Sequence, residues 1–489
     1  MKKKHIIYGV LSGILIFVSI PLFHLLSTKL AENKTEVSIP NGFVDDESHL
    51  NLTKVDSIIV VKSDSISLIK QIQSVLEYAN DHKLKISIAG TKHSMGGHTI
   101  SKNGIQLNML NYNRMSLDTL TNILSIGSGA TWEQAIKYLD KYNRSISIMQ
   151  AFSTFSIGGS ISVNGHGWQK NSPPLSNSVK SFTIMLANGE IKNCSRTNND
   201  ELFHLAIGGY GLIGIILDVK LTVAKNISLQ YKYINMTTSN YIKHYNEYIT
   251  NNPNTELVFG RLKVSNKDFL ENATLNFFLK TPLTPKKIVT DKEDSFESKR
   301  VVFRGSVNSE YGKRLRWDLE KTANYISKNN VYSRNELLND DVTLIENKDS
   351  NSTDILHEYF IPERNFMKFI ESIKEPLLKT KIDLLNITIR RVEKDTDAFL
   401  NYAKETVYGF VILFNQQKNN DSEEQMKSLT LKLIDCTIES EGTYYLPYRL
   451  HVTKEKMREI YPQAERFFNL KLKYDPEDLF SNKFYLKYK

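Results

Sequence analysis

A glycine-rich turn, AGTKHSMGGHT at residues 89–99, constrains the fold more than any other stretch of this chain. It follows a strand-like run at 84–88 and contains three glycines and two histidines. Glycine has no Cβ, so its backbone can turn sharply and approach another group closely. The residues alone are compatible with a metal site, a catalytic base, a cofactor-binding turn or a plain loop.

Two further glycine-rich passages lie downstream. The first is TFSIGGSISVNGHG at 154–167, and the second, GYGLIG at 209–214, matches the pattern GxGxxG. A Rossmann dinucleotide fingerprint requires a strand before its glycines and a helix after them. Here a helix predicted at 201–207 precedes the glycines and a strand predicted at 214–223 follows them. The match is therefore not a Rossmann fingerprint, although its glycines still indicate close backbone approach.

Bulk properties exclude several classes of function. A length of 489 residues is enough for two or three packed units. The net charge of +9 comes from lysines spread along the chain, which favours a solvated basic surface over a nucleic-acid groove. Cys194 and Cys436 cannot form a CxxC zinc site, and His93 and His98 have no nearby metal-ligand partner. We therefore expect no bound metal and no nucleic-acid partner.

The N-terminal run IIYGVLSGILIFVSIPLFHLL, residues 6–26, contains no Lys, Arg, Asp or Glu. Its length matches the roughly 30 Å hydrocarbon core of a bilayer, and no clear small-x-small cleavage site follows it. A single-pass transmembrane signal anchor is therefore favoured over a cleaved secretory signal. The lysines at 2–4 would stay in the cytoplasm under the positive-inside rule. This predicts a membrane protein with a cytoplasmic tail at 1–5, a linker at 27–50 and the rest of the chain extracytoplasmic.

Hydrophobic periodicity predicts an α+β fold. In the first part of the chain, short strands alternate with a helix at 66–80 and a helix at 131–143, for which Thr131 is the expected N-cap. The apolar stripe of the first helix consists of Ile69, Ile72, Val75, Leu76 and Ala79.

After about residue 225 the pattern changes to long strands with helices between them. This indicates a second unit with an antiparallel sheet and helices packed on it. The expected strands are 255–264, 273–281, 384–392 and 407–415, and the expected helices are 311–326 and 365–379. The charged stretch 284–300 is predicted to be a surface loop, and residues 457–480 are predicted to form a helix that stops at Asp475-Pro476.

Four motifs occur in order along the chain. The passages at 89–99 and 154–167 are followed by DELFHLAIGGYGLIGI at 200–215 and YDPEDLFSN at 474–482. Together they closely resemble the vanillyl-alcohol oxidase and p-cresol methylhydroxylase superfamily, the PCMH-type FAD flavoproteins. Within it the chain looks most like the sugar-lactone (D-arabinono-1,4-lactone) and alditol oxidases, and it also resembles the decaprenylphosphoryl-ribose oxidases.

The resemblance implies a domain organisation and a cofactor site. It predicts a two-subdomain FAD-binding domain at 51–225, a substrate or cap domain at 226–445, and a C-terminal segment, 446–489, that returns to the FAD domain. Turns without Cβ atoms can offer backbone N–H groups to the two negative charges of the FAD pyrophosphate. The implied FAD-binding residues are Gly90, Thr91, Lys92, His93, Ser94, Gly96, Gly97, Gly158, Gly159, Ser162, Gly165, Gly214 and Ile215.

His93 matches the histidine that related oxidases bond covalently to the flavin. The sequence GTKHS here is very like the GTRHS turn of the alditol oxidases. The resemblance therefore implies FAD bonded through His93, with His98 as a bystander. Other relatives make a second bond through a cysteine, but the matching position here is close to Phe152, so at most one bond is expected.

Four residues are catalytic candidates by the same resemblance. The segment RLHVTK at 449–454 is similar to the RLYxAK segment of the decaprenylphosphoryl-ribose oxidases, whose catalytic lysine matches Lys454, and their histidine matches His166. Glu358 in HEYFIP and Arg390 in IRRVEKD match a substrate-contacting acid and a neighbouring arginine of the alditol oxidases. An acid and an arginine on facing strands can equally be a structural ion pair, and Lys454 can equally be a solvated lysine at a helix start.

The expected activity is oxidation of a CH–OH group of a sugar, sugar lactone or polyol, with hydride transfer to flavin N5. The segment PYRLH at 447–451 departs from the PHW-K arrangement of the aldonolactone oxidases, which weakens the expectation of a lactone substrate. Two alternatives stay open: oxidation of a lipid-linked sugar at the membrane, and a noncatalytic flavin-fold binding module. Oxygen, a quinone and a cytochrome all remain possible electron acceptors.

Overall fold

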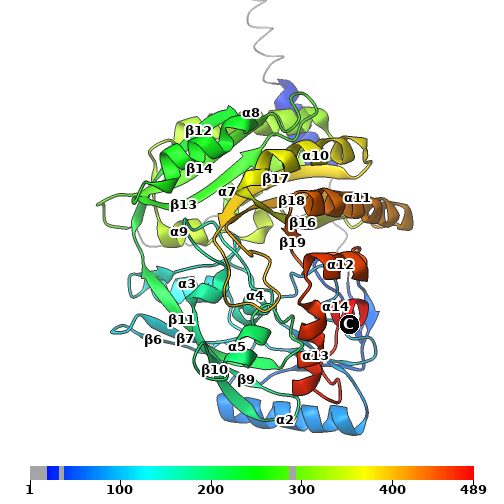
Figure 1. The fold of residues 1–489 in the computed structure, drawn as a ribbon. Helices are drawn as coiled ribbons and strands as arrows, with labels where there is room; N and C mark the ends of the chain where they lie inside the picture. The colour runs from blue at the N-terminus through cyan, green and yellow to red at the C-terminus, as the bar shows by residue number, and fades with distance from the viewer. Residues whose placement is uncertain (1–18, 32–37, 286–292) are drawn as a thin grey trace, which may run out of the picture.

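The chain folds into two lobes that face each other (Figure 1). The computed structural model describes residues 19–31, 38–285 and 293–489. Strands and helices are mixed in both lobes, as the periodicity predicts for an α+β fold. The lower lobe in Figure 1 holds two sheets from the first half of the chain, and the upper lobe is built on one large sheet.

The first sheet of the lower lobe has three parallel strands in the order β3-β5-β4. These strands are β3 (Ser57–Val60), β4 (Ile86–Ala89) and β5 (Ile105–Asn108). Helix α2 (Ser65–Asp81) begins at the N-cap Asp64 and packs its apolar face against this sheet. The predicted stripe is correct except that Leu68, rather than Ile69, is fully buried.

The second sheet is antiparallel, in the order β10-β9-β11-β7-β6, with β8 also paired to β11. Its strands are β6 (Met115–Asp118), β7 (Ile123–Gly127), β8 (Arg144–Ile146), β9 (Val179–Met185), β10 (Ile191–Ser195) and β11 (Ile215–Lys225). The helices of this lobe include α3 (Trp132–Asp140), α4 (Ile157–Ser162) and α5 (Asp200–Ala206). Thr131 caps α3 as predicted, in a reciprocal pair of hydrogen bonds with Gln134. The helix-before, strand-after order around 209–214 is also confirmed.

The upper lobe contains the predicted antiparallel sheet, in the order β15-β12-β14-β13-β17-β18-β16-β19. Its strands are β12 (Ser228–Thr237), β13 (Thr255–Leu262), β14 (Asn272–Lys280), β15 (Val331–Ser333), β16 (Ser352–Pro362), β17 (Asp383–Val392), β18 (Val407–Gln417) and β19 (Thr443–Tyr444). The accompanying helices are α6 (Tyr241–Tyr245), α7 (Glu293–Arg304), α8 (Glu310–Ser327), α9 (Arg334–Leu338), α10 (Phe366–Lys379) and α11 (Asn420–Glu439).

The two faces of this large sheet differ because successive strand residues point to opposite sides. On one face, Phe410 packs against Phe366 and Phe369 of α10, at ring-centroid distances of 5.3 and 4.9 Å. On the other face, Val411 lies in register with Glu358 of β16 and with Thr388 of β17. The second face therefore carries polar side chains towards the lower lobe.

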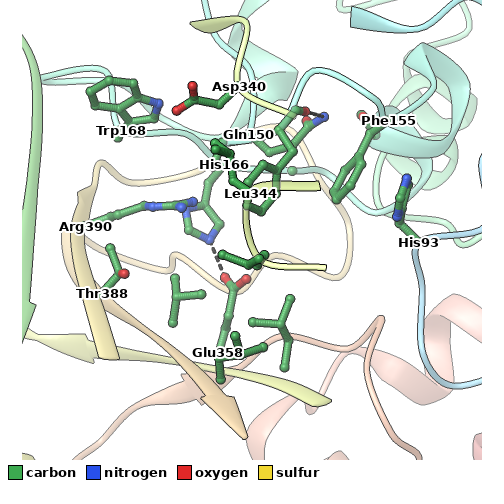
Figure 2. Close-up of a pocket in the computed structure, with 18 of the residues that line it drawn as sticks. His93, Gln150, Phe155, His166, Trp168, Asp340, Leu344, Glu358, Thr388 and Arg390 are labelled. Atoms are coloured by element: carbon green, nitrogen blue, oxygen red, sulfur yellow. Dashed lines mark hydrogen bonds and ion pairs between the residues drawn. The ribbon is translucent and has the colours of Figure 1, made fainter. Parts of the chain in front are cut away.

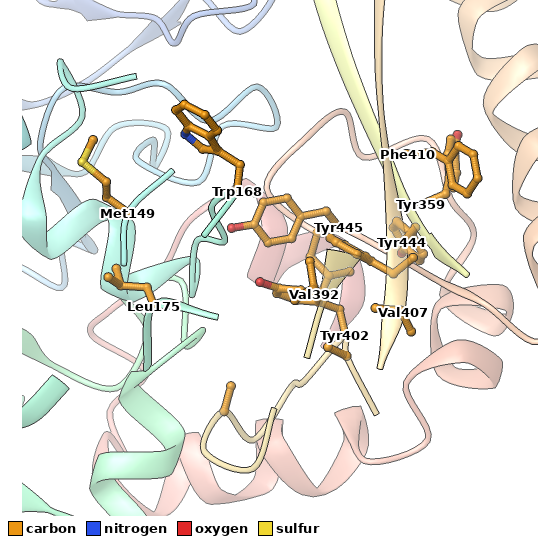
Figure 3. Close-up of a cluster of buried hydrophobic side chains, with 14 of the residues drawn as sticks. Met149, Trp168, Leu175, Tyr359, Val392, Tyr402, Val407, Phe410, Tyr444 and Tyr445 are labelled. Atoms are coloured by element: carbon orange, nitrogen blue, oxygen red, sulfur yellow. The ribbon is translucent and has the colours of Figure 1, made fainter. Parts of the chain in front are cut away.

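Buried aromatic side chains join the two lobes (Figure 3). The hydroxyl of Tyr402 donates to the backbone oxygen of Asn164 at 2.8 Å, and that of Tyr445 donates to the backbone oxygen of Val163 at 2.9 Å. A buried hydroxyl keeps its hydrogen bond because losing it costs about 1–3 kcal/mol. The backbone at 163–164 is therefore held from the upper lobe.

The C-terminal segment forms three helices, α12 (Lys454–Ile460), α13 (Ala464–Tyr474) and α14 (Lys483–Tyr488). The prediction of one continuous helix from 457 is wrong, because Pro462 lacks the N–H that a helix interior needs. The predicted stop at Asp475-Pro476 is correct. Beyond it, the backbone around Phe480 pairs with Ile86 and extends the parallel sheet by one bridge.

Two boundaries differ from those expected. Helix α7 occupies 293–304 and overlaps the end of the stretch predicted to be a loop, and residues 286–292 lie outside the described part of the chain. Folded structure also begins before residue 51, because β1 (Phe43–Val44) pairs with β2 (Thr53–Lys54) and Val44 is buried. The predicted linker is therefore shorter than 27–50.

The predicted membrane anchor at 6–26 is only partly described. Residues 6–18 lie outside the described residues, and residues 19–31 are helical. In that helix, Nε2 of His24 lies 2.8 Å from the backbone oxygen of Gly305. Within the described ranges, the structure contains no helix with both the length and the apolar character needed to cross a bilayer.

Candidate active site

A cavity of about 1200 Å³ lies between the lobes (Figure 2). Its lower wall consists of the glycine-rich passages around 89–99 and 154–167. Its upper wall consists of one face of the large sheet, together with side chains from α7 and α8. A cavity of this size can hold a large cofactor and a small substrate side by side.

The two glycine-rich passages pack closely against each other, and glycine is required at the contact. A Cβ on Gly90 would come within 2.0 Å of Oγ of Ser156, and one on Gly158 within 2.8 Å of Cβ of Ser128. The backbone N–H of Ser156 also donates to Oγ1 of Thr91 at 3.1 Å. The sequence therefore folds into a smooth cradle whose wall is mostly backbone.

The turn of the cradle exposes backbone donors. The N–H groups of residues 90–94 donate to no acceptor among the described residues, and Lys92 is in the left-handed region with φ of 61°. Successive free N–H groups in such a turn form a concave site for anions. Buried side-chain polar atoms that line the same cavity also lack partners in the described protein: Oγ of Ser94, Oγ1 of Thr99, Oγ of Ser128 and Oε1 of Gln150.

The turn is fixed from two sides. The carboxylate of Asp46 accepts a hydrogen bond from the N–H of Gly97 at 2.7 Å, and burial raises the pKa of Asp46. On the other side, Nδ2 of Asn482 donates to the backbone oxygens of His98 and Tyr210, at 2.8 and 2.9 Å. The cradle is thus held by chain segments that lie far from it in the sequence.

A buried histidine–carboxylate pair lies under the upper sheet. Nε2 of His166 and Oε2 of Glu358 are 2.5 Å apart, and both side chains are less than 10% exposed (Figure 2). The hydroxyl of Tyr448 donates to the other carboxylate oxygen, also at 2.5 Å. Burial alone would raise the pKa of Glu358, but the neighbouring His166, Arg390 and Tyr448 lower it below its ordinary value. Glu358 is therefore an ionised acceptor at neutral pH.

Several contacts hold His166 in place. The Asn164 side chain donates to Asp395 at 2.8 Å, while Tyr402 and Tyr445 hold the backbone just before the histidine. Phe360 contacts the imidazole edge-on, with a ring-centroid distance of 5.1 Å. A side chain that is packed in this way keeps one rotamer, as a reactive group must.

Arg390 and Thr388 stand beside this pair on β17 (Figure 2). They are two residues apart and therefore point to the same face of the sheet. Nε of Arg390 is buried without a partner in the described structure, and the guanidinium contributes to the low pKa of Glu358. The site thus combines a carboxylate, an imidazole, a phenol and a guanidinium at the edge of a backbone cradle.

Comparison with known families identifies the cradle. Residues 66–195 match the model of an FAD-binding domain. This stretch contains the turn at 89–99 and the passage at 154–167. The chain therefore contains an FAD-binding domain that is similar to that of the PCMH-type FAD flavoproteins. FAD is the cofactor of this domain.

Several curated relatives resemble this flavoprotein. A putative D-arabinono-1,4-lactone oxidase of Neurospora crassa is 27% identical over 35% of this chain and 31% of its own length. L-gulonolactone oxidase of Bos taurus is 27% identical over 33% of this chain and 37% of its own length. Cytokinin dehydrogenase 4 of Arabidopsis thaliana is 21% identical over 81% of this chain and 80% of its own length. The matches to the lactone oxidases thus span about a third of those proteins.

The cradle of this flavoprotein fits FAD. The unpaired N–H groups of 90–94 suit a pyrophosphate, and the unpartnered polar atoms of Ser128 and Gln150 suit a ring system rich in hydrogen-bonding groups. When bound, FAD supplies the hydride-accepting flavin ring. The residues predicted from the resemblance that line the cavity are Gly90, Thr91, Lys92, His93, Ser94, Gly158, Gly159, Ser162, Gly165 and Gly214.

Three predicted cofactor residues do not line the cavity. Gly96 and Gly97 lie behind the turn, where a Cβ on Gly96 would come within 2.4 Å of the backbone oxygen of Tyr448. Ile215 is fully buried in the apolar core beside the parallel sheet. These residues shape the cradle of the flavoprotein, but they do not face its cavity.

His93 lies at the mouth of the cradle. Its ring stacks on Phe155 with a centroid distance of 4.1 Å, and its Nδ1 lies 3.3 Å from Oε2 of Glu47. His98 also lines the cavity, although the resemblance assigned it no role. Burial lowers the pKa of His98 to about 3, so this histidine is neutral, and it packs between Tyr210 and Phe484.

The structure separates Lys454 from the other catalytic candidates. Lys454 is the first residue of α12, its Nζ donates to the backbone oxygen of Lys489, and it does not line the cavity. Thr453 caps this helix, and the Lys454 side chain is half-buried beside the C-terminal residue Lys489. The catalytic role expected for Lys454 is therefore not supported, whereas His166, Glu358 and Arg390 lie together.

Reasoning from sequence missed Tyr448, Thr388 and Arg261, which all line the cavity. A usable signal was present for part of this set. In β17, Asn386, Thr388 and Arg390 alternate with isoleucines, which places three polar side chains on one face of a buried strand. No comparable local pattern marks Tyr448, which reaches Glu358 only through the fold.

Proposed function

We propose that this flavoprotein oxidises a CH–OH group of a sugar, sugar lactone or polyol and passes the hydride to its flavin. The observation that carries the proposal is the buried His166–Glu358 pair beside the FAD cradle. A carbinol must lose its hydroxyl proton when it loses a hydride, so the reaction needs a base at this place. Relatives named as lactone oxidases support this kind of substrate.

His166 is the proposed base, and Glu358 is its orienting partner. Because the ionised Glu358 only accepts hydrogen bonds, Nε2 of His166 must carry its proton. The neutral imidazole then presents Nδ1 as an acceptor, and this nitrogen is buried without a partner in the described structure. A substrate hydroxyl at Nδ1 would give its proton to the ring, and the Glu358 carboxylate would stabilise the resulting imidazolium.

Tyr448 and Arg390 keep the carboxylate in this role. Burial and the adjacent Glu358 raise the pKa of Tyr448, so its hydroxyl remains a donor. The positive charge of Arg390 compensates the carboxylate in a site from which most water is excluded. Without these two partners, desolvation would drive Glu358 towards its neutral form, which cannot hold His166 in the required tautomer.

A lipid-linked sugar is a second candidate substrate. Apolar side chains of Val302, Phe303, Leu319 and Ile326, from α7 and α8, line the outer part of the cavity. This wall suits a substrate with a hydrocarbon portion better than a free polyol. We also propose that the uncharged run at 6–26 anchors the chain in the membrane, with its catalytic part outside the cytoplasm. To test this topology, a cysteine is introduced near residue 40 and treated with a thiol reagent that cannot cross the membrane. Labelling in intact cells supports the proposal, and absence of labelling contradicts it.

Anaerobic flavin reduction tests the activity directly. The purified, FAD-loaded protein is mixed with alditols, aldonolactones, hexoses and a polyprenyl-phosphoryl sugar, and the loss of flavin absorbance is recorded. Reduction by members of the first three groups supports the proposal, and reduction by the polyprenyl compound alone supports the second candidate. If none of them reduces the flavin, the proposed activity is wrong, and the fold acts as a binding module. Oxygen, a quinone and cytochrome c are then compared as reoxidants.

A further inference from the structure

The cavity-facing side of the large sheet carries a polar row that extends beyond the catalytic pair. Glu358 on β16 is in register with Val411 on β18, which is in register with Thr388 on β17. Thr388 is in register with Arg261 on β13. Three strand spacings separate the ends of this row, about 14 Å along the sheet. Arg261 therefore lies in the same cavity as His166, at a distance that suits the far end of a substrate.

The charges along this wall are not balanced. Three arginines line the cavity, namely Arg261, Arg316 and Arg390. Arg390 lies beside Glu358, and Nε of Arg316 is 3.4 Å from Oε1 of Glu320. Arg261 forms no ion pair with any residue in the described parts of the chain. Of the three arginines, Arg261 is the one that has neither an ion pair nor Glu358 beside it.

Arg261 also affects both of its neighbours. Burial is the main reason that the pKa values of Arg316 and Arg390 are lowered, and the positive charge of Arg261 lowers both further. Three guanidinium groups in one largely apolar cavity repel one another unless an anion joins them. An anionic ligand near Arg261 would relieve this repulsion.

Hydrogen bonds hold Arg261 in place without using up its donors. One Nη of Arg261 donates to Oδ1 of Asn386 at 2.5 Å, and Nδ2 of Asn386 donates to Oγ1 of Thr388 at 2.9 Å. A guanidinium has five N–H donors in a rigid fork, so several remain for a ligand. The same chain of bonds leaves the Thr388 hydroxyl proton free to donate into the cavity.

We propose that the substrate carries an anionic oxyacid group, a carboxylate or a phosphate, which Arg261 binds while the reacting carbon lies at the His166–Glu358 pair. The inference rests on the proposed function for the position of the reacting carbon. Asn386 orients the guanidinium, and Thr388 adds a neutral donor between the two ends. The planar fork of arginine matches both anions with two parallel hydrogen bonds. The substrate class is thus a sugar acid or a phosphorylated polyol.

Three probes of similar length distinguish the possibilities: glucitol, gluconate and glucitol 6-phosphate. Each is tested for anaerobic flavin reduction by the FAD-loaded protein and by Arg261→Gln, Arg261→Lys and the matched control Arg314→Gln, whose arginine is exposed on α8 and outside the cavity. We expect an anionic probe to exceed glucitol in kcat/KM, with gluconate and glucitol 6-phosphate separating the carboxylate from the phosphate source.

The variants locate the anion. Arg261→Gln should lower kcat/KM for the preferred anionic probe by about 10- to 100-fold, mostly through KM, and should lower it far less for glucitol. Arg261→Lys should retain part of the preference because it keeps the charge but loses the fork. Equal effects of Arg261→Gln on charged and neutral probes, or a preference for glucitol in the wild type, would overturn the inference while the proposed oxidation stands.

A binding measurement separates this inference from the proposed reaction. Inorganic phosphate and acetate are titrated into the FAD-loaded protein, and the flavin absorbance spectrum and the melting temperature are followed. At least one anion should give a saturable change in the wild type and in Arg314→Gln, and the change should be lost in Arg261→Gln. If no probe reduces the flavin but this change is seen, the reaction fails and the anion site survives. If neither anion produces it, the anion site is rejected.

Discussion

His166 and Glu358 are 192 residues apart in the chain, yet their side chains meet at 2.5 Å in the interior. The histidine comes from the glycine-rich wall of the lower lobe, and the glutamate comes from a strand of the upper sheet. The pair can therefore form only when the two lobes are closed on each other. If the pair acts as proposed, the site becomes active only when the lobes dock.

Replacing Glu358 with glutamine should uncouple the pair. The amide can donate to His166 and so favours the wrong tautomer, and it carries no charge to stabilise an imidazolium. We expect the rate of flavin reduction by the best substrate to fall by about a hundredfold or more, with FAD content unchanged, as measured by anaerobic stopped-flow absorbance. Glu371→Gln, an exposed acid on α10, is the matched control. A wild-type rate in Glu358→Gln would rule out this role.

Replacing His93 with alanine tests covalent attachment. If the imidazole is bonded to the flavin, the yellow chromophore of the wild type precipitates with the protein in acid, and His93→Ala releases it to the supernatant. His82→Ala removes an exposed histidine and should behave like the wild type. A wild-type supernatant that already holds all the flavin would show that FAD is bound without a covalent bond.

Replacing Lys454 with alanine should leave turnover nearly unchanged. Its side chain reaches the backbone of Lys489 rather than the cavity, and surface substitutions of this kind usually change rates or stability by about twofold or less. Steady-state kcat and KM are compared with those of Lys456→Ala, a neighbouring surface lysine. A loss of more than about tenfold with full FAD content would mean that α12 moves during catalysis.

Asp395 should make the stability of the protein depend on pH. Burial raises its pKa from 3.8 to about 6. Between these values the unfolded chain has released the proton and the folded chain has kept it, so stability falls as pH rises from about 4 to about 6 and is then level. The loss from this residue should not exceed about 3 kcal/mol, since one pKa unit corresponds to about 1.4 kcal/mol.

Urea unfolding at pH 4, 5, 6 and 7 checks this dependence through a comparison of variants. Asp395→Asn cannot titrate, so its stability should change less over this range than that of the wild type. Asp81→Asn, at an exposed position, should keep the wild-type profile. Parallel profiles for all three proteins would show that Asp395 has an ordinary pKa.

The local sequence pattern was sufficient to predict the helices and strands, but it did not predict which side chains meet in the folded protein. The stripe of α2, the capping of α3 by Thr131 and the alternating strands of the upper sheet depend on neighbours in the sequence, so they could be predicted. The direction of Lys454 depends on how α12 packs, which no local pattern records. The same holds for Tyr448, which finds Glu358 across 90 residues.

Motif resemblance located the cofactor cradle better than the substrate site. The cradle is made of backbone and glycine, so its sequence signal is continuous and short. The substrate face is assembled from single residues on several strands, so no continuous stretch of sequence marks it. Strand β17 is the exception, because Asn386, Thr388 and Arg390 share one face and their alternation with isoleucines can be recognised in the sequence.

The bonds from Asn482 to the cradle have a consequence for biosynthesis. The FAD-binding turn is translated within the first hundred residues, but the clamp that closes it is made almost four hundred residues later. A ribosome-bound nascent chain therefore carries an open cradle until residue 482 has left the exit tunnel. Stable flavin binding is expected to need this late segment, and a premature stop codon before this asparagine should yield a colourless product.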